Sequence, residues 1–94
     1  MRSTFVKVLI RLAEEDPRIV LITPDLGVSV LEEFEEKFPT RFLNVGIAEQ
    51  NAVGVAAGMA LSGKIVFVYS IIPFVTMRPF EQIRNDCAYM NTNV

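Results

Sequence analysis

Apolar and polar residues repeat with helical spacing in some segments of the chain and run together in others. Between residues 4 and 15, apolar side chains recur at i, i+3, i+4, i+7 and i+8, which is typical of one face of an amphipathic helix. That face consists of Phe5, Val8, Leu9, Leu12 and Ala13. Ser3 is the expected N-cap, and Asp16-Pro17 ends the helix because the residue before a proline disfavours helical backbone.

A second amphipathic helix is predicted between residues 29 and 38. Ser29 followed three positions later by Glu32 is a capping-box pattern, and Pro39 stops the helix. Four glutamates and Lys37 face away from its apolar stripe. The stripe consists of Leu31, Phe34 and Phe38.

Three short apolar runs read as strands: "IVLIT" at 19–23, "FLNV" at 42–45 and "IVFVYS" at 65–70. Continuous apolar, β-branched runs are typical of strands that are buried on both faces of a parallel sheet. Helices are predicted between and after them, over 48–61 and 79–90. This alternation predicts an α/β fold, an open and mostly parallel sheet with flanking helices.

The two later helices carry further expectations. The helix over 48–61 has almost no polar face and should be buried all round. Gly54 and Gly58 lie on one side of it at a cost of about 1 kcal/mol each relative to alanine, which makes sense if another backbone packs closely there. In the last helix, Pro79 lies in the first turn and three side chains should face inward. These are Phe80, Ile83 and Cys87.

The composition of the chain excludes several classes of protein. The 94 residues suit one small domain, and a hydrophobic content of 51% excludes a disordered chain. Acids outnumber bases by 11 to 9 without a basic stripe, which argues against nucleic acid as a partner. No apolar run reaches membrane-spanning length and no signal-peptide pattern begins the chain, so a cytoplasmic location is expected.

The chain has one cysteine, Cys87, and no histidine. An internal disulfide is therefore excluded, and no zinc or transition-metal site is expected. Because histidine is the usual general base, acid–base chemistry must use other side chains or an external group.

Glu49 is the only ionisable residue between Arg41 and Lys64. It lies in the first turn of a predicted helix, where the helix dipole favours an acid by about 0.3–1 kcal/mol, and this explains it without any function. The apolar turns that follow would also desolvate it, however, so the carboxylate needs a hydrogen-bonding partner that can share a proton. A ligand nitrogen is one candidate.

Other residues lie where ligands bind in open α/β sheets, at the carboxyl ends of the strands. Asp25 follows the first strand, although an aspartate there is also a common turn residue. Ser29 at a helix start could help to bind an anion, or could act only as a cap. Tyr69, Ile71 and Phe74 surround the end of the third strand, where ordinary core packing would also explain them.

Together these segments resemble the pyrimidine-binding domain of the transketolase family of thiamine-diphosphate enzymes. The stretch "NVGIAEQNAVGVAAGMALSGKIVFVYSIIPFV" carries the resemblance, with "ITPDLGVS" before it and "RPFEQIRNDCAYMNTNV" after it. The similarity covers nearly the whole chain and is strongest to the C-terminal subunit of a split transketolase. It implies that residues 1–94 are the N-terminal part of such a domain.

The resemblance implies a catalytic role for Glu49. In this family the glutamate of a "GIAEQ"-type motif hydrogen-bonds N1′ of the cofactor pyrimidine and favours the imino tautomer of its exocyclic nitrogen. That nitrogen then deprotonates C2 of the thiazolium ring. The cofactor would thus supply the base that a chain without histidine lacks.

The resemblance also implies functional roles for five further residues. Phe74 matches the aromatic residue that lines the aminopyrimidine pocket, and Ile71 stands where many transketolases have a second aromatic, which leaves room for a specialised sugar substrate. Asp25 matches an acidic residue near the cofactor and the subunit interface. Ser29 and Arg2 match positions that hold the substrate phosphate.

The family's diphosphate and Mg²⁺ site lies in a different domain, so a diphosphate-binding transketolase subunit is the expected partner in a homo- or hetero-oligomer. The Gly54/Gly58 face should pack against another chain, and the 94 residues alone are expected to be inactive. The implied reaction is transfer of two-carbon ketol units between sugar phosphates. The alternatives are a fragment of a deoxyxylulose-phosphate synthase or of a ketoacid dehydrogenase β-subunit, and a non-catalytic α/β assembly module.

Overall fold

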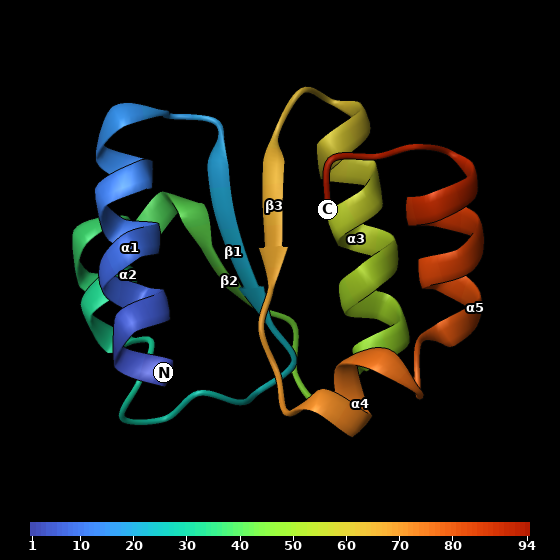
Figure 1. Ribbon diagram of the computed structural model, residues 1–94, viewed down its shortest axis with the longest axis horizontal. Coiled ribbons are helices and arrows are strands. Elements are labelled where there is room, and N and C mark those ends of the chain that lie inside the picture. Colours follow the sequence, from blue (N-terminus) through green and yellow to red (C-terminus); the bar gives the residue numbers. More distant parts are fainter.

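The computed structural model describes all 94 residues, Met1 to Val94. A three-stranded parallel sheet lies between two layers of helices (Figure 1). The strands are β1 (Ile19–Thr23), β2 (Phe42–Asn44) and β3 (Ile65–Val68). Their order in the sheet is β2-β1-β3, and Leu21 of β1 stands opposite both Phe42 and Phe67. The predicted open parallel α/β sheet is confirmed.

Helices α1 and α2 cover one face of the sheet, and α3 and α5 lie on the other side (Figure 1). The helical segments are α1 (Arg2–Glu15), α2 (Glu32–Lys37), the 3₁₀ turn η1 (Pro39–Arg41), α3 (Glu49–Leu61), α4 (Ile72–Thr76), α5 (Phe80–Gln82) and the π-helical η2 (Ile83–Tyr89). None of the helices combines the length and the apolar character needed to cross a bilayer.

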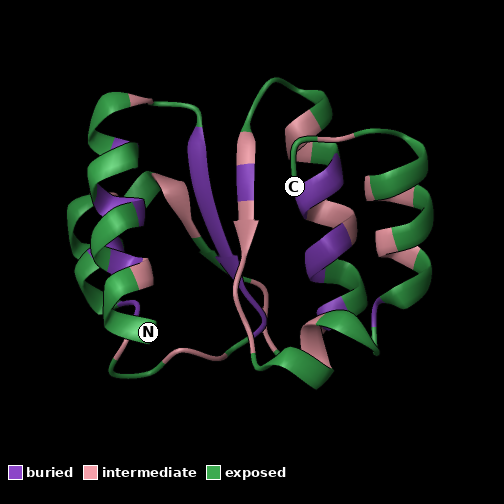
Figure 2. Ribbon diagram, viewed as in Figure 1, coloured by how far each residue is buried: buried purple, intermediate pink, exposed green.

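Strand β1 separates two hydrophobic cores, and all five of its residues are buried (Figure 2). Ile19 and Leu21 join the core beneath α1 and α2, whereas Val20 and Ile22 join the core beneath α3. Successive side chains of a strand point to opposite faces, so a strand covered on both faces must be apolar throughout. The sequence "IVLIT" meets that requirement.

The buried face of α1 differs from the predicted one. Its buried residues are Val6, Leu9, Ile10 and Ala13. Val8 and Leu12 are 41% and 39% exposed, so their predicted burial is wrong. The apolar stripe of this helix is wider than the surface that β1 and α2 cover, and packing decides which part of the stripe is buried. Ser3 lies inside the helix rather than at its N-cap, because the helix begins at Arg2.

The predicted burial of β2 and α3 is also only partly correct. Strand β2 ends at Asn44 and is an edge strand, so Leu43 is 39% exposed and Asn44 is exposed. Strand β3 ends at Val68 rather than at residue 70. In α3 only one side contacts the sheet, and Gln50 and Leu61 are exposed. The helix is therefore not buried all round.

No other part of this chain approaches the two glycines of α3. A Cβ atom added at Gly54 or at Gly58 would have no heavy atom within 4 Å. The close backbone contact expected there is therefore absent within the chain, and contact with another chain stays a prediction.

The C-terminal region departs from the predicted single helix. Helix α4 was not predicted, and the last helix continues from α5 into the wider turns of η2. Phe80 is 64% exposed, so its predicted inward orientation is wrong. Ile83 and Cys87 are half-buried, and burial raises the pKa of the Cys87 thiol.

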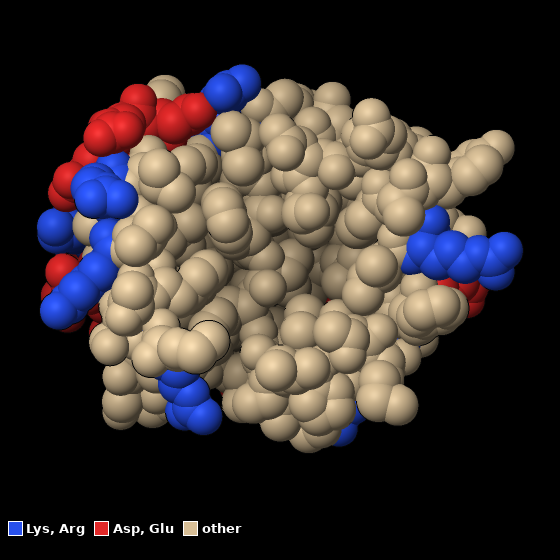
Figure 3. All heavy atoms as spheres, viewed as in Figure 1, with Lys and Arg blue, Asp and Glu red and all other residues tan.

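Charged side chains lie at the flanks of the face seen in Figure 3, whose centre is uncharged and hollowed. Val8, Leu12 and Phe67 line an apolar groove of about 390 Å³ between α1 and β3.

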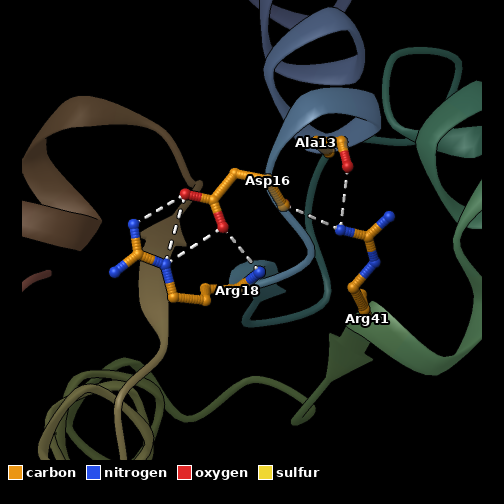
Figure 4. Close-up of polar contacts among 4 residues, drawn as sticks. All are labelled: Ala13, Asp16, Arg18 and Arg41. Atoms are coloured by element: carbon orange, nitrogen blue, oxygen red, sulfur yellow. Dashed lines mark hydrogen bonds and ion pairs between the residues drawn. The ribbon is translucent and has the colours of Figure 1, made fainter.

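Two arginines contact the polypeptide where α1 ends and the chain leads into β1 (Figure 4). The Arg18 side chain donates from Nη2 to Asp16 Oδ2 at 2.8 Å, and the Arg18 backbone N–H donates to Asp16 Oδ1 at 2.9 Å. Arg41, the last residue of η1, donates from Nη1 to the carbonyl oxygens of Ala13 and Asp16 at 3.0 and 3.1 Å. These hydrogen bonds satisfy carbonyl groups at the helix end.

The contacts with Arg18 lower the pKa of Asp16 from 3.8 to about 2. A carboxylate with a lowered pKa in the folded protein stabilises the fold above its ordinary pKa, and that stabilisation disappears as the pH falls from about 4 to about 2. We expect wild type to be more stable than Asp16→Asn at pH 7 and the difference to shrink across that acid range. Urea denaturation at a series of pH values measures this, and a constant difference would contradict it.

Two phenylalanines provide a matched test of the core. Phe34 is completely buried beneath α1, whereas Phe80 is 64% exposed. Phe34→Ala should lower the free energy of unfolding by about 3–5 kcal/mol because it leaves a cavity. Phe80→Ala should lower it by less than about 1 kcal/mol. Similar losses in urea denaturation would show that the two side chains are misplaced.

Candidate active site

The three parallel strands end at one edge of the sheet, the lower edge in Figure 1. The segments that follow them, residues 24–31, 45–48 and 69–79, therefore gather there. Ligands of open α/β sheets bind at this edge because loops from several strands converge on it. All the residues implied in cofactor binding lie in or beside these segments.

Glu49 is the first residue of α3, and its side chain is only 8% exposed. No side chain caps this helix start. The carboxylate accepts a hydrogen bond from Nη1 of Arg78 at 2.7 Å, and the Arg78 side chain is 46% exposed. Glu49 is thus desolvated as expected, but its partner comes from the same chain.

Arg78 also lies against an aromatic ring. Its guanidinium carbon is 3.4 Å from the centroid of the Phe74 ring, which is cation–π geometry. The carbonyl oxygen of Arg78 accepts a hydrogen bond from Nε2 of Gln50 at 3.3 Å, and the next residue, Pro79, is buried. The start of α3, helix α4 and the segment before α5 therefore meet around Glu49.

Glu49 and Phe74 lie close enough for one flat group to contact both. The guanidinium of Arg78 is a flat group with N–H donors, and it contacts the Glu49 carboxylate and the Phe74 ring at the same time. An aminopyrimidine is likewise flat and presents a ring nitrogen that can share a proton with a carboxylate. The two residues therefore fit the pyrimidine half of thiamine diphosphate.

Asp25 belongs to a turn that joins the ends of β1 and β2. Its backbone has a positive φ of 58°, and its N–H donates to Asn44 Oδ1 at 3.1 Å. Asn44 Nδ2 donates back to Asp25 Oδ1 at 2.9 Å, and the Gly46 N–H donates to the same Asn44 oxygen at 2.9 Å. These contacts give Asp25 a turn-forming role, and no hydrogen bond connects it to Glu49.

Arg2 and Ser29 line one cavity of about 750 Å³ at the start of α1. Lys7, Glu32 and Glu33 line it as well, so its charge is mixed. Half of the predicted capping box is present, because the Ser29 N–H donates to Glu32 Oε1 at 2.5 Å. Helix α2 begins only at Glu32, so Ser29 is not its N-cap. Hydrogen bonds from the backbone N–H groups of Glu32 and Ser29 lower the pKa of the Glu32 carboxyl.

Ile71 immediately precedes α4 and is 43% exposed. With Arg2 and Tyr69 it lines a second cavity, of about 220 Å³. Arg78 thus connects Glu49 with Phe74. Ser29 and Ile71 line two different cavities, and Arg2 lines both of them. Asp25 stands apart with Asn44.

No role was predicted for Arg78, Gln50 or Asn44. A signal for Arg78 was present, because it is the only charged residue between Lys64 and Glu81, as Glu49 is between Arg41 and Lys64. Two isolated charges of opposite sign in apolar surroundings are expected to pair. Nowhere do three or more acidic or cysteine side chains cluster closely enough to hold a metal ion.

Known proteins of one family resemble this chain. The family described as the transketolase pyrimidine binding domain matches residues 1–94. An apulose-4-phosphate transketolase subunit of Phocaeicola vulgatus is 45% identical over 94 residues, which are 99% of this chain and 30% of that protein. The 6-deoxy-6-sulfo-D-fructose transketolase subunit SqwH of Clostridium sp. is 40% identical, over all of this chain and 30% of that protein.

A 1-deoxy-D-xylulose-5-phosphate synthase from Listeria monocytogenes is 47% identical over 92% of this chain and 14% of that enzyme. A solved structure described as a split gene transketolase, inactive beta4 tetramer, superposes with a TM-score of 0.90 at 45% identity. The alignment covers 99% of this chain and 31% of that one.

The fold and these comparisons define the class of the chain as an α/β domain of the kind found in transketolases. The chain belongs to the transketolase family, as a pyrimidine-binding domain. It spans less than a third of the length of these transketolase relatives.

The hydrogen bonds of Asn44 predict how the edge beside Glu49 is ordered. Asn44→Ala removes the acceptor for the Asp25 and Gly46 N–H groups, so both amides should exchange with deuterium several-fold faster. The control is Asn51→Ala, because Asn51 is exposed and its side chain makes no hydrogen bond within the chain. Unchanged exchange at Asp25 and Gly46 would show that this network does not order the turn.

Proposed function

We propose that the chain forms the aminopyrimidine-binding half of a thiamine-diphosphate site in a transketolase that transfers two-carbon ketol units between sugar phosphates. The observation that carries the proposal is the buried Glu49 carboxylate beside the Phe74 ring, bridged by one flat N–H donor. The names of the 45% and 40% identical relatives, both transketolase subunits, support the reaction class.

In this proposal Glu49 holds a proton at N1′ of the pyrimidine. Its position at the start of α3 and its burial strengthen a hydrogen bond to a ring nitrogen, because little water competes for the carboxylate. Phe74 provides the apolar surface on which the ring lies. When bound, thiamine diphosphate supplies the carbon nucleophile that accepts the two-carbon unit.

A partner must provide the rest of the site. Large apolar residues are exposed around the carboxyl edge of the sheet, where they would suit a surface covered by another subunit. They are Val28, Ile47, Ile71, Ile72, Met77 and Phe80. We assign the diphosphate and Mg²⁺ to a diphosphate-binding transketolase subunit that packs over this edge.

The remaining implied residues have subsidiary roles in the proposal. Arg2 and Ser29 share a cavity, which would allow them to hold a substrate phosphate together. Ile71 would form an apolar wall without ring stacking, and Asp25 would approach the cofactor only through the turn that it shares with Asn44. Because the chain spans about 30% of the length of its transketolase relatives, we assign activity to the assembled enzyme and expect these 94 residues alone to be inactive.

One specific observation favours a second reaction with the same cofactor. A 1-deoxy-D-xylulose-5-phosphate synthase is 47% identical over 92% of this chain, so the same proposed site could serve that reaction instead. The two reactions are distinguished by substrate, because only the synthase requires a keto acid donor that loses carbon dioxide.

Substitution of Glu49 tests the catalytic assignment. In the complex of the chain with its diphosphate-binding partner, Glu49→Gln should lower the rate of ketol transfer by about 100-fold or more, because the amide cannot share the proton in the same way. Glu81→Gln is the control, since Glu81 is an exposed acid of α5 and should leave the rate nearly unchanged.

Equal rates for Glu49→Gln and wild type would refute the role of Glu49. If the wild-type complex does not bind thiamine diphosphate with Mg²⁺ in calorimetry, the reading of the chain as a non-catalytic assembly module replaces the proposal.

A further inference from the structure

Arg78 already makes the two contacts that the proposed function assigns to the aminopyrimidine. It donates a hydrogen bond to Glu49 Oε1 at 2.7 Å, and its flat guanidinium lies 3.4 Å from the Phe74 centroid. Stacked groups in contact are separated by about this distance, so nothing can be inserted between the guanidinium and that face of the ring.

Two flat groups with these contacts would interfere with each other. Both would use the Glu49 carboxylate, which is buried and has no other hydrogen-bond donor within the chain. The aminopyrimidinium form, in which the aminopyrimidine has gained a proton at N1′, is cationic, and a guanidinium is always charged, so these two would repel each other at close range. Simultaneous occupation of the site is therefore unfavourable.

The Arg78 side chain can leave without disturbing the core. It is 46% exposed, and its neighbours Met77 and Phe80 are 74% and 64% exposed. Its backbone is held separately, by the hydrogen bond from Gln50 and by the buried Pro79 that follows. A rotation of the side chain alone would release both Glu49 and Phe74.

We propose that Arg78 is an internal competitor for the aminopyrimidine position and sets the affinity of the site for its cofactor. The inference rests on the proposed function, because it takes Glu49 and Phe74 as the pyrimidine site. Arg78 keeps the Glu49 carboxylate paired until a pyrimidine replaces it. A stronger Arg78 contact then means weaker cofactor binding.

The test measures binding of the pyrimidine half of the cofactor, 4-amino-5-hydroxymethyl-2-methylpyrimidine, to the full chain. Titration followed in ¹H–¹⁵N correlation spectra reports the affinity and shows at the same time that each variant is folded. Arg78→Gln should bind about tenfold more tightly than wild type, because a partly exposed ion pair and a cation–π contact no longer compete. Arg84→Gln is the matched control, since Arg84 is exposed and forms no ion pair within the chain.

Salt provides a second readout. Raising the ionic strength screens the partly exposed Arg78–Glu49 pair, so wild type should approach the affinity of Arg78→Gln while the variant changes less. Glu49→Gln should weaken binding in both backgrounds.

Each result has a definite meaning. If Arg78→Gln binds more weakly than wild type, Arg78 orients Glu49 for the ligand and the competitor role is overturned. If the two bind equally, with Glu49 still required, the competitor role fails while the proposed function stands. If no variant binds in a way that depends on Glu49, the proposed function fails and the inference fails with it.

Discussion

Strand β1 is the element on which the rest of the molecule depends, because it is covered on both faces and paired on both edges. All five of its residues are buried, with Leu21 and Ile22 completely so. A strand in this position excludes water from both cores, and it fixes β2 and β3 as parallel neighbours. Parallel pairing brings the carboxyl ends of all three strands to one edge. Glu49, Phe74 and Arg78 are adjacent for that reason.

The pairing of Glu49 with Arg78 follows from the cost of leaving a carboxylate without a partner in apolar surroundings. Glu49 precedes turns made mainly of alanine, valine and glycine, which cannot hydrogen-bond to it. Removing one member of a buried pair leaves the other charge uncompensated, and this costs more than the intact pair contributes. The same need makes the carboxylate receptive to a cofactor nitrogen, so one physical property serves both the fold and the proposed chemistry.

The exposed surface agrees with a domain that works as part of an assembly. The cores occupy the middle of the sheet, while apolar side chains such as Ile47, Ile72 and Met77 remain exposed around the site edge. The relative described as an inactive beta4 tetramer shows that a similar chain forms an oligomer without activity. In the proposed function, activity requires a partner that covers the edge and brings the diphosphate site to Glu49.

The sequence alone determined the class of fold, because continuous β-branched runs such as "IVLIT" suit only strands covered on both faces. It also singled out Glu49, because a lone carboxylate in an apolar segment stands out in one dimension. The sequence did not predict burial correctly where packing chooses among several apolar surfaces. The wide apolar stripe of α1 could be buried on more than one side, and the edge position of β2 leaves Leu43 exposed.

Only the tertiary structure decided the partner of Glu49. Arg78 is 29 residues away along the chain, and the two meet because α3 and the segment after α4 converge at the same edge of the sheet. The spacing of apolar residues along a sequence indicates helices and strands. It does not indicate which distant segments packing brings into contact.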